Sequence, residues 1–490
     1  MQTSGVKRQT SNVKGQTNGD RASGGPVTRD QGSPKPAALV IGGGIAGIQA
    51  ALDIADAGYP VYLVEREPSI GGRMAQLDKT FPTLDCSSCI LTPKMVDVGR
   101  HPNIELMTYS EVVSVAALDG APPEESASPT RGFRVRVRKK PRYVDLDRCT
   151  GCGLCAAACR MKGRVVSRFD EGIANRSAIY VPFPQAVPLK YTVDPSACLY
   201  LTRGRCGKTF LCKEACPADA IDFEQQEELV DLDVETIIVA TGFDLLDPRL
   251  KPEFGYDVYP EVMTGVEFER LSSASGPTMG KITVSGREPK DVVFIKCVGS
   301  RDPHTGVPYC SRVCCMYTAK HAHLVRDKLP DARITIFYMD VRAFGKGYEE
   351  FYDRVKHERV IYRRGEPSEV YRLRKNGDDT GRVVVLAEDT LLGRPIEVEA
   401  DLVVLATAVV PRTDVAEVAG LLGLERSPDG FFQEAHAKLS PVDTNLDRIF
   451  MAGCCQGPKD IPDTVAQAKA AASSALGVLS RCERKLTFDV

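Results

Sequence analysis

Cysteine spacing is the feature of this sequence that points most directly to chemistry. Twelve of the 17 cysteines lie between Cys149 and Cys315. The first four are spaced C-x2-C-x2-C-x3-C, as in bacterial ferredoxins. In two-cluster ferredoxins the first three of these cysteines ligate one [4Fe-4S] cube and the fourth ligates the other. This spacing is more specific than structural zinc or a disulfide network requires, so it predicts iron–sulfur clusters.

A second cysteine run should supply the remaining ligands of two cubes. It ends in Cys216-Pro217, as the second half of a two-cluster ferredoxin does, although its early spacings are longer. The predicted ligands of the first cluster are Cys149, Cys152, Cys155 and Cys216. The predicted ligands of the second cluster are Cys159, Cys198, Cys206 and Cys212.

A third cysteine set, spaced C-x12-C-x3-C-C, begins at the end of a predicted strand. Its members are Cys297, Cys310, Cys314 and Cys315. Adjacent cysteines rarely ligate one cluster in ferredoxins, so the spacing alone also allows zinc or buried thiols. A dinucleotide-binding reductase would carry its second glycine-rich turn here, but the turn reads Lys296-Cys-Val-Gly-Ser-Arg301. A metal site in place of a nicotinamide site predicts that electrons arrive through clusters rather than as hydride.

The remaining cysteines are Cys86, Cys89, Cys454, Cys455 and Cys482. The pair in Cys86-Ser-Ser-Cys89 is compatible with half of a further metal site, with a redox dithiol or with two buried thiols. Two cysteines cannot complete a cube. A cluster at this pair therefore needs a partner chain, or Cys454 and Cys455 brought close by the fold.

A glycine-rich turn opens the folded part of the chain. Gly42-Gly-Gly-Ile-Ala-Gly47 matches G-x-G-x-x-G directly after an apolar strand and at the start of a helix. These glycines permit a tight turn, close approach of the backbone to a pyrophosphate, and close packing of helix on strand. The phosphate then lies at the helix N-terminus. Glu65 ends the next strand and is placed to accept a hydrogen bond from an adenosine ribose, which completes a predicted dinucleotide site.

Later motifs favour FAD over NAD. The stretch from Glu65 to Arg73 resembles the second half of the signature of two-dinucleotide-binding flavoproteins, and residues 240–242 and 449–453 resemble their later landmarks. Such proteins usually end the last motif in Gly-Asp, whereas Cys454 stands here, which puts the usual ribityl contact in doubt. The residues predicted to bind FAD are Gly42, Gly44, Ala46, Gly47, Glu65, Arg66, Gly72, Arg73, Ala240, Thr241, Gly242, Gly453 and Thr464.

Composition argues against a nucleic-acid or membrane function. The net charge is −2, and the apolar (43%) and charged (26%) fractions are ordinary for a globular protein. No apolar run approaches the roughly 20 residues that cross a bilayer, and the N-terminus lacks a secretory signal. Clustered cysteines in such a chain indicate metal ligands and a reducing cytoplasm. Residues 1–36 are almost free of apolar side chains and are predicted to be a disordered tail.

Strands that alternate with helices predict an α/β fold with parallel sheets. Strands are expected at 37–41, 61–65, 133–138, 234–242, 291–297, 333–337 and 401–406, and a last helix at about 464–479. The FAD-binding domain is predicted to comprise residues 37–140, 229–262 and 401–490. An inserted ferredoxin domain is predicted at 141–228, and a second nucleotide-binding-like domain with the third cysteine set at 263–400.

Several longer motifs resemble those of the heterodisulfide reductase A-subunit family. They are Gly71–Pro82, Asp85–Met95, His101–Ile104, Lys296–Asp302 and Tyr309–Lys320, within a resemblance that runs from about Ala37 to Leu479. The resemblance implies a thioredoxin-reductase-like flavoprotein fold with an inserted 2[4Fe-4S] ferredoxin-like domain. It also implies a [4Fe-4S] cluster at the third cysteine set close to the flavin. A catalytic lysine near the isoalloxazine, here Lys320, would stabilise an anionic reduced flavin.

The resemblance further implies an oxidoreductase subunit whose flavin splits an electron pair between a low-potential and a high-potential acceptor. The implied partners are heterodisulfide reductase B/C-like subunits, a hydrogenase, formate dehydrogenase or NADH module, and ferredoxin, in a hetero-oligomer that could also dimerise. Methanogen members carry an extra N-terminal domain and a C-terminal ferredoxin domain. The shorter chain is similar to subunits of sulfate-reducer and aromatic-degrading complexes.

The sequence is also compatible with two other functions. One is an NAD(P)H-dependent oxidoreductase similar to the small subunit of glutamate synthase, which also joins ferredoxin motifs to flavin folds. The missing glycine turn near Cys297 argues against it. The other is a passive relay or assembly subunit whose flavin does not turn over.

Overall fold

The structure is a computed structural model that describes residues 35–118 and 132–488. Of the predicted tail, residues 1–34 lie outside the described residues. A parallel five-stranded sheet with the order β24-β13-β1-β2-β5 carries the glycine-rich turn. Its strands are β1 (Ala38–Ile41), β2 (Val61–Glu65), β5 (Ile104–Thr108), β13 (Thr236–Val239) and β24 (Ile449–Met451).

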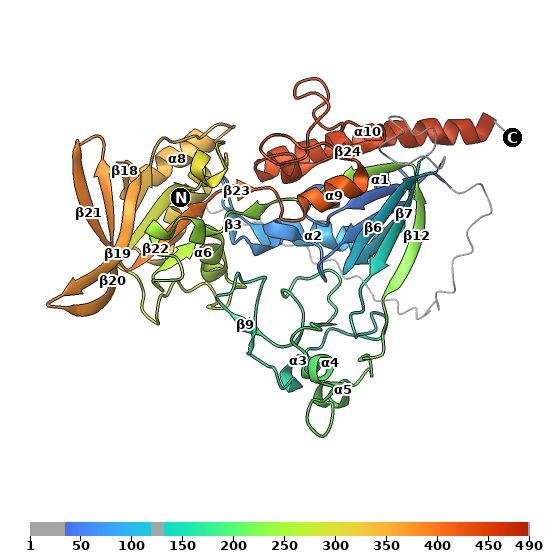
Figure 1. Ribbon diagram of the computed structural model, residues 1–490, viewed down its shortest axis with the longest axis horizontal. Helices are drawn as coiled ribbons and strands as arrows, with labels where there is room; N and C mark the ends of the chain where they lie inside the picture. Colours follow the sequence, from blue (N-terminus) through green and yellow to red (C-terminus); the bar gives the residue numbers. More distant parts are fainter. Residues whose placement is uncertain (1–34, 119–131, 489–490) are drawn as a thin grey trace, which may run out of the picture. The chain divides into compact units, whose positions relative to one another are not determined.

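The two faces of this sheet are covered by different layers, because successive side chains of a strand point to opposite faces. Ala38 and Val40 pack on the face covered by helices, whereas Leu39 packs on the other. The helices are α1 (Ile45–Asp56), α2 (Ser87–Arg100) and α10 (Ile461–Phe488), with α1 and α10 side by side (Figure 1). The other layer comprises an antiparallel sheet of β6 (Ser110–Ala117), β7 (Phe133–Lys139) and β12 (Glu228–Val234), together with α9 (Val415–Leu422).

The elements described so far form the first α/β unit, and a second α/β unit has the same arrangement of a parallel sheet between helices and antiparallel strands. Its parallel sheet has the order β15-β22-β16-β17-β18. The strands are β15 (Val262–Thr264), β16 (Asp291–Val298), β17 (Arg333–Tyr338), β18 (Val360–Arg364) and β22 (Leu402–Thr407). One face is covered by α6 (Gly265–Ser272), α7 (Cys314–Lys328) and α8 (Tyr348–His357). The other is covered by the antiparallel strands β19 (Pro367–Lys375), β20 (Asp378–Asp389) and β21 (Arg394–Ala400).

The cysteine-rich segment leaves the first unit at the end of β7 and returns at the start of β12. These two strands pair antiparallel, with Lys139 opposite Glu228. The segment contains only short elements, among them α3 (Leu154–Ala158), α4 (Leu199–Arg203) and α5 (Leu211–Glu214). Its small core includes the side chains of Cys149, Cys155 and Cys198. A segment with so little apolar core gains much of its stability from any metal that its cysteines bind.

The last helix is longer than the sequence pattern indicates. It begins at Ile461 rather than near Thr464 and continues to Phe488. Pro462 is tolerated in the first turn because its missing N–H has no helical acceptor there. Asp460 supports the same turn, since its Oδ1 accepts a hydrogen bond of 2.8 Å from the Asp463 N–H.

The parallel sheets confirm the predicted α/β fold class. The carboxyl ends of β1 and β2, where folds of this class bind ligands, carry the glycine-rich turn and Glu65. Across residues 35–118 and 132–488, none of the helices is both long and apolar enough to span a bilayer.

Candidate flavin and iron–sulfur sites

Among the three glycines that match G-x-G-x-x-G, Gly42 and Gly47 leave no room for a side chain, whereas Gly44 does. A Cβ on Gly42, whose φ is +108°, would lie 2.4 Å from the Ala240 carbonyl oxygen and 3.2 Å from the Thr241 Cα. A Cβ on Gly47 would lie 1.8 Å from the Gly42 oxygen. A Cβ on Gly44, at the N-cap of α1, would meet no atom within 4 Å. The open position faces the space where a pyrophosphate would meet the helix N-terminus.

Glu65, the acidic residue predicted to bind ribose, is hydrogen-bonded to this turn. Glu65 Oε2 accepts a hydrogen bond from the Gly43 N–H (2.6 Å), and Oε1 accepts one from the Glu67 N–H (2.8 Å). Burial raises the pKa of Glu65, and these hydrogen bonds oppose the increase. Arg66 is exposed and pairs with Asp414 at 2.5 Å. The fold therefore brings Glu65 to the glycines and directs Arg66 toward a carboxylate of the same unit.

The second glycine pair lies directly on the glycine-rich turn. The Gly71 N–H donates a hydrogen bond of 2.7 Å to the Gly43 carbonyl oxygen. A Cβ on Gly72 would lie 2.9 Å from the Gly44 Cα. Both members have positive φ, +126° for Gly71 and +54° for Gly72, which favours glycine. The two glycine motifs, about 25 residues apart in sequence, therefore form one backbone-lined surface.

Arg73 connects the first unit to the cysteine-rich segment. Its Nη1 forms an ion pair of 2.6 Å with Glu171, and the same carboxylate oxygen accepts a hydrogen bond of 2.7 Å from the Gln76 side chain. A longer ion pair of 3.7 Å reaches Asp244. The predicted cofactor-binding arginine thus has carboxylate partners within the chain.

The last flavin motif packs on the first. Gly453 has a φ of +80°, and a Cβ there would lie 2.9 Å from the Ala46 Cβ and 3.3 Å from the Thr464 Cγ2. Gly242, at the end of the other landmark, also has positive φ (+81°), and no atom lies within 4 Å of its Cβ position. The structure therefore brings together the predicted residues of all four motifs around the N-terminus of α1.

The two cysteines after Gly453 differ in environment. Cys455 is buried, and its thiol hydrogen-bonds the Val239 and Ala452 carbonyl oxygens at 3.3 and 3.2 Å. Burial raises the pKa of Cys455 to about 11. Cys454 is half-buried, and its thiol donates to the Lys459 carbonyl oxygen at 3.4 Å. Neither replaces the carboxylate of the usual Gly-Asp ending.

Lys459 is a candidate site residue that sequence reasoning missed. Its ammonium donates to the carbonyl oxygens of Gly453 (2.8 Å) and Gly457 (2.9 Å) and to Gln456 Oε1 (2.9 Å). Burial lowers its pKa, and the Cys454 side chain opposes that shift. The lysine therefore holds the loop between the last flavin motif and α10. The turn-forming Gly457-Pro458 directly before it was the available signal.

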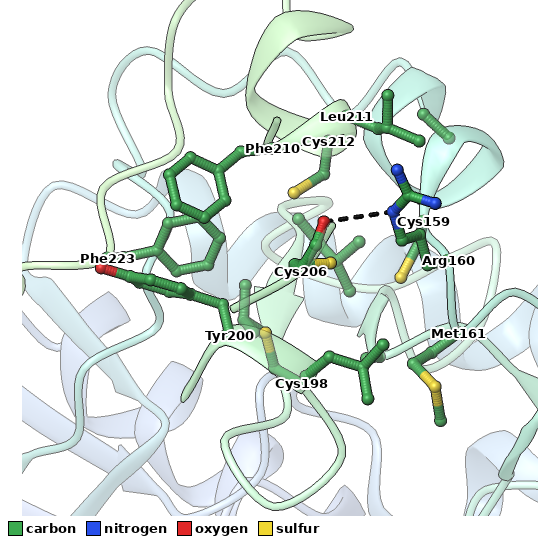
Figure 2. Close-up of a pocket in the computed structure, with 15 residues that line it drawn as sticks. Cys159, Arg160, Met161, Cys198, Tyr200, Cys206, Phe210, Leu211, Cys212 and Phe223 are labelled. Carbon is green, nitrogen blue, oxygen red and sulfur yellow. Dashed lines mark hydrogen bonds between the residues drawn. The ribbon is translucent and has the colours of Figure 1, made fainter. Parts of the chain in front are cut away.

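Four cysteines from separate parts of the inserted segment line one cavity (Figure 2). They are Cys159, Cys198, Cys206 and Cys212, the predicted ligands of the second cluster. Burial raises the pKa of Cys212 to about 11, and the nearby Cys159 and Cys198 thiols raise it further. Three aromatic side chains that contact one another, Tyr200, Phe210 and Phe223, close one side of the cavity. This environment is apolar and sulfur-lined, which suits a [4Fe-4S] cube.

The first four-cysteine cavity is lined by Cys149, Cys152, Cys155 and Cys216, the predicted ligands of the first cluster, and the cavity around Cys159, Cys198, Cys206 and Cys212 is the second four-cysteine cavity. Burial raises the pKa of Cys155 to about 12, and the other three thiols add to the increase. Cys216 thus lies with the first cysteine run rather than with its own, the crossed arrangement of two-cluster ferredoxins. Among the described residues, no three histidine, cysteine, aspartate or glutamate side chains converge on a point that would hold a single metal ion.

Three members of the third cysteine set meet at the junction of β16 and α7. Cys297, Cys314 and Cys315 are buried, and Cys314 hydrogen-bonds both other thiols. The Lys296 ammonium lies 3.3 Å from the Cys315 sulfur. The hydrogen bond with Cys314 lowers the pKa of Cys315 to about 5, against burial and with the help of Lys296. Thiolate is the form in which cysteine ligates an iron–sulfur cluster.

The fourth member of the third set, Cys310, is half-buried, and its sulfur accepts a hydrogen bond of 3.3 Å from the Arg312 N–H. Arg312 also donates to the Pro458 carbonyl oxygen (3.1 Å) and pairs with Asp463 (3.0 Å). The third cysteine set is therefore hydrogen-bonded to the loop and helix that follow the last flavin motif.

Lys320 lies in a buried charge cluster on α7. Its ammonium donates to the Lys79 carbonyl oxygen at 2.9 Å and forms a close ion pair with Glu269, which also contacts His321 Nε2 at 2.5 Å. Burial alone would raise the pKa of Glu269, but Lys320 and His321 lower it to about 2. The charge of Lys320 is thus balanced within the chain by a residue that sequence reasoning did not single out.

Replacing Glu269 by glutamine should destabilise the fold by about 3–5 kcal/mol, because it leaves the Lys320 charge buried without its partner. The folded-state pKa of Glu269 lies below its unfolded value, so its contribution is complete above about pH 4.5 and is lost as pH falls toward 2. Thermal denaturation at pH 7 and at pH 3 should therefore show a smaller difference from the parent at pH 3.

Two controls sharpen this test. The exposed Glu288→Gln should leave the melting temperature unchanged, and Glu269→Gln with Lys320→Met should recover much of the loss, because it removes both buried charges. An equal loss of stability at both pH values would contradict the assignment of the charge to Glu269.

Cys86 and Cys89 form a disulfide at the start of α2. The Cys86 sulfur also accepts a hydrogen bond of 3.2 Å from the Cys89 N–H. The pair is therefore not two buried thiols, because the sulfurs are bonded and Cys89 is exposed, and a redox role for it stays a prediction. The sulfurs of Cys454 and Cys455 are instead hydrogen-bonded within their own loop and to β13.

Comparison with known proteins places these sites in a family context. A family model for FAD dependent oxidoreductase matches residues 38–82, and one for a 4Fe-4S binding domain matches residues 142–162. The chain is 55% identical over 449 residues to an iron-sulfur A subunit of the CoB--CoM heterodisulfide reductase of Methanopyrus kandleri, covering 91% of the chain and 65% of that protein.

Two further relatives also carry names of heterodisulfide reductase A-subunits or of proteins similar to them. The A subunit of the H(2):CoB-CoM heterodisulfide,ferredoxin reductase of Methanothermobacter marburgensis is 51% identical, over 92% of the chain and 65% of that protein. A protein of Archaeoglobus profundus that is named as similar to the heterodisulfide reductase A-subunit is 48% identical, over 91% of the chain and 67% of that protein. The chain thus spans about two thirds of the length of these relatives. Among solved structures, Lactococcus lactis thioredoxin reductase is 14% identical, with a TM-score of 0.47 over 91% of the chain and 100% of that chain.

Proposed function

The chain belongs to the heterodisulfide reductase A-subunit family, and on that premise we propose that it is an FAD- and iron–sulfur-dependent electron-transfer component of a multi-subunit redox complex. The observation that carries the proposal is the sorting of eight cysteines from two sequence runs into two separate four-cysteine cavities. Sulfur-lined cavities of this kind serve one-electron transfer. The glycine surface around Gly44 supplies the site for the flavin.

Bound FAD would exchange electrons singly or in pairs. Gly42, Gly44 and Gly47 would receive its pyrophosphate at the N-terminus of α1, and Glu65 would receive the ribose. Gly453, in the loop that Lys459 holds, and Thr464, on α10, would border the same site next to Ala46. We propose that Lys320, with its charge balanced by Glu269, adjusts the electrostatics of the flavin site rather than acting as an isolated cation.

Short links join the first four-cysteine cavity to the glycine surface. The Ile70 N–H donates to the Val187 carbonyl oxygen (3.1 Å), and the Val187 N–H donates to Ser69 Oγ (2.9 Å). Three residues further on, the Lys190 ammonium donates to the Cys149 carbonyl oxygen (2.5 Å). These bonds fix the first cysteine set against the flavin-binding turn, which supports an electron route between the flavin and the inserted segment.

We propose further that the flavin bifurcates electrons, with the third cysteine set holding a [4Fe-4S] cluster beside it. The name of the Methanothermobacter marburgensis relative, a heterodisulfide,ferredoxin reductase, combines a heterodisulfide with ferredoxin, which supports this proposal. The proposed partners are proteins similar to the B and C components of heterodisulfide reductase, a hydrogenase, formate dehydrogenase or NADH module, and ferredoxin. The hydrogen bonds of Arg312 to the third set and to the α10 region support a short path between that cluster and the flavin.

Anaerobic reduction of the reconstituted protein tests this function. Reduced methyl viologen should bleach the flavin and produce cluster EPR signals, whereas NADH alone should not, because Lys296–Arg301 replaces a nucleotide-binding glycine turn. Reduction by NADH alone would instead support the nucleotide-linked alternative. A flavin that viologen cannot reduce would support a passive relay. In a potentiometric titration, bifurcation requires the two one-electron flavin potentials to be crossed.

A further inference from the structure

Exposed basic residues lie close in sequence to residues that line the second four-cysteine cavity. We call them the basic face: Lys162, Arg164, Arg203, Arg205, Lys208 and Lys213. All are solvent-exposed. Arg205 directly precedes the cavity residue Cys206, and Lys213 directly follows Cys212. The only exposed acidic residue in the same stretches, 159–164 and 199–216, is Glu214.

The basic face is structurally organised around the cavity. Arg160 Nε donates a hydrogen bond of 3.1 Å to the Cys206 carbonyl oxygen (Figure 2), which joins the stretch after Cys159 to the loop that carries Arg205 and Lys208. A Cβ on Gly207 would lie only 2.6 Å from the Arg160 guanidinium, so the loop packs directly on this arginine. The charges therefore belong to one site formed by two segments about 40 residues apart in sequence.

The surroundings of the first four-cysteine cavity carry charges of both signs. Asp147 and Asp219 are exposed there, Arg148 pairs with Asp219 at 3.1 Å, and the Lys190 ammonium donates to the Cys149 carbonyl oxygen. Asp222 and Glu224 are exposed on either side of Phe223, a residue that lines the second four-cysteine cavity. In contrast, none of the six basic-face residues forms an ion pair with another described residue. The net charge of the whole chain is −2. The basic face is therefore a local feature of one cluster site and not a general property of the protein.

Like charges that crowd one surface repel one another, and a partner of opposite charge relieves that repulsion and is steered to the surface from solution. We propose that the basic face is the docking surface for an iron–sulfur electron-transfer protein that presents an acidic face. This inference rests on the proposed function, because it needs a cluster in the second cavity. In each transfer, one cluster is oxidised by one electron and the cluster across the interface is reduced by one. No bond forms or breaks.

Charge reversal tests the docking surface in the intact, cofactor-loaded protein. The variant Arg203→Glu, Arg205→Glu, Lys208→Glu changes only exposed residues outside the ligand set. The control variant Arg374→Glu, Lys375→Glu, Arg394→Glu changes the charge equally on exposed positions of the β19–β21 sheet. The probe is a reduced, acidic 2[4Fe-4S] ferredoxin, and stopped-flow absorbance gives the second-order rate of electron transfer at several ionic strengths.

The basic-face variant should react roughly 10-fold or more slowly than the parent at low ionic strength, and the control variant should match the parent. The parent rate should also fall as salt is added, a result that needs no substitution. Equal rates for the two variants, or a parent rate that does not change with ionic strength, would overturn the inference. Polynucleotide binding at the basic face without any change in the ferredoxin rate would overturn it as well.

Methyl viologen separates the failure of this inference from the failure of the proposed function. If viologen reduced the flavin and clusters of every variant while ferredoxin showed no dependence on the basic face, the function would stand and the docking surface would not. If neither donor reduced the flavin, the proposed function would fail and the docking inference would fail with it.

Discussion

Replacing Gly44 by valine should give a folded chain that no longer retains FAD. The backbone at Gly44 has a φ of −75°, which any residue adopts, and a Cβ there meets no protein atom within 4 Å. Valine at this N-cap position costs about 1 kcal/mol. Its methyl groups, however, fill the space into which the pyrophosphate must come. We expect FAD affinity to fall at least about 100-fold, measured by flavin fluorescence after desalting.

Gly47 provides the contrast that makes this test specific. A Cβ there would lie 1.8 Å from the Gly42 carbonyl oxygen, so Gly47→Ala should disturb the packing of α1 on β1 whether or not FAD is present. Its melting temperature without FAD should fall, whereas that of Gly44→Val should stay close to the parent. Gly420→Val, an exposed substitution on α9 with open space around it, controls for valine in a helix. Stoichiometric FAD in Gly44→Val would contradict the proposed phosphate site.

The crossed cysteine assignment predicts an iron loss that depends on which two ligands are removed together. Cys149→Ser with Cys216→Ser should remove about 4 iron per chain, because both cysteines line one cavity. Cys149→Ser with Cys159→Ser should remove about 8, because these line different cavities. The two double variants delete the same number of thiols, so each is the control for the other.

Ligation in sequence order would reverse these two results. Cys149 and Cys159 would then share a cube, and their joint loss would remove only about 4 iron. Iron analysis of anaerobically reconstituted protein, with EPR of the reduced state to count remaining clusters, distinguishes the two arrangements. Loss of about 8 iron from Cys149→Ser with Cys216→Ser would contradict the crossed assignment.

Local patterns were sufficient to predict the elements that carry the flavin motifs. Short apolar runs beside glycine, such as the one before Gly42, identify buried parallel strands because both faces of such strands are covered. The grouping of eight cysteines around two cavities was also predictable, since cluster geometry determines which members of a ferredoxin run lie together, whereas their ligation of clusters stays a prediction. The longer spacings between Cys198 and Cys212 did not prevent the structure from placing them around one cavity with Cys159.

Contacts between distant parts of the chain were not predictable from the sequence. Lys320 could be placed on a helix, but its partner Glu269 lies 51 residues earlier on α6, and no local pattern joins them. Arg73 was expected to contact the cofactor, and its ion pair with Glu171 depends on how the inserted segment folds back. The basic face likewise arises only when the segments after Cys159 and around Cys206 meet.

The most direct test of the central claim is the iron, sulfide and flavin content of the anaerobically purified chain, read together with EPR during a reductive titration. The account predicts about 12 iron, about 12 sulfide and one FAD per chain, with signals from three [4Fe-4S] clusters. A content of about 8 iron would remove the cluster from the set at Cys297, Cys310, Cys314 and Cys315. That result would leave the flavin without its adjacent relay and contradict the proposed bifurcating function.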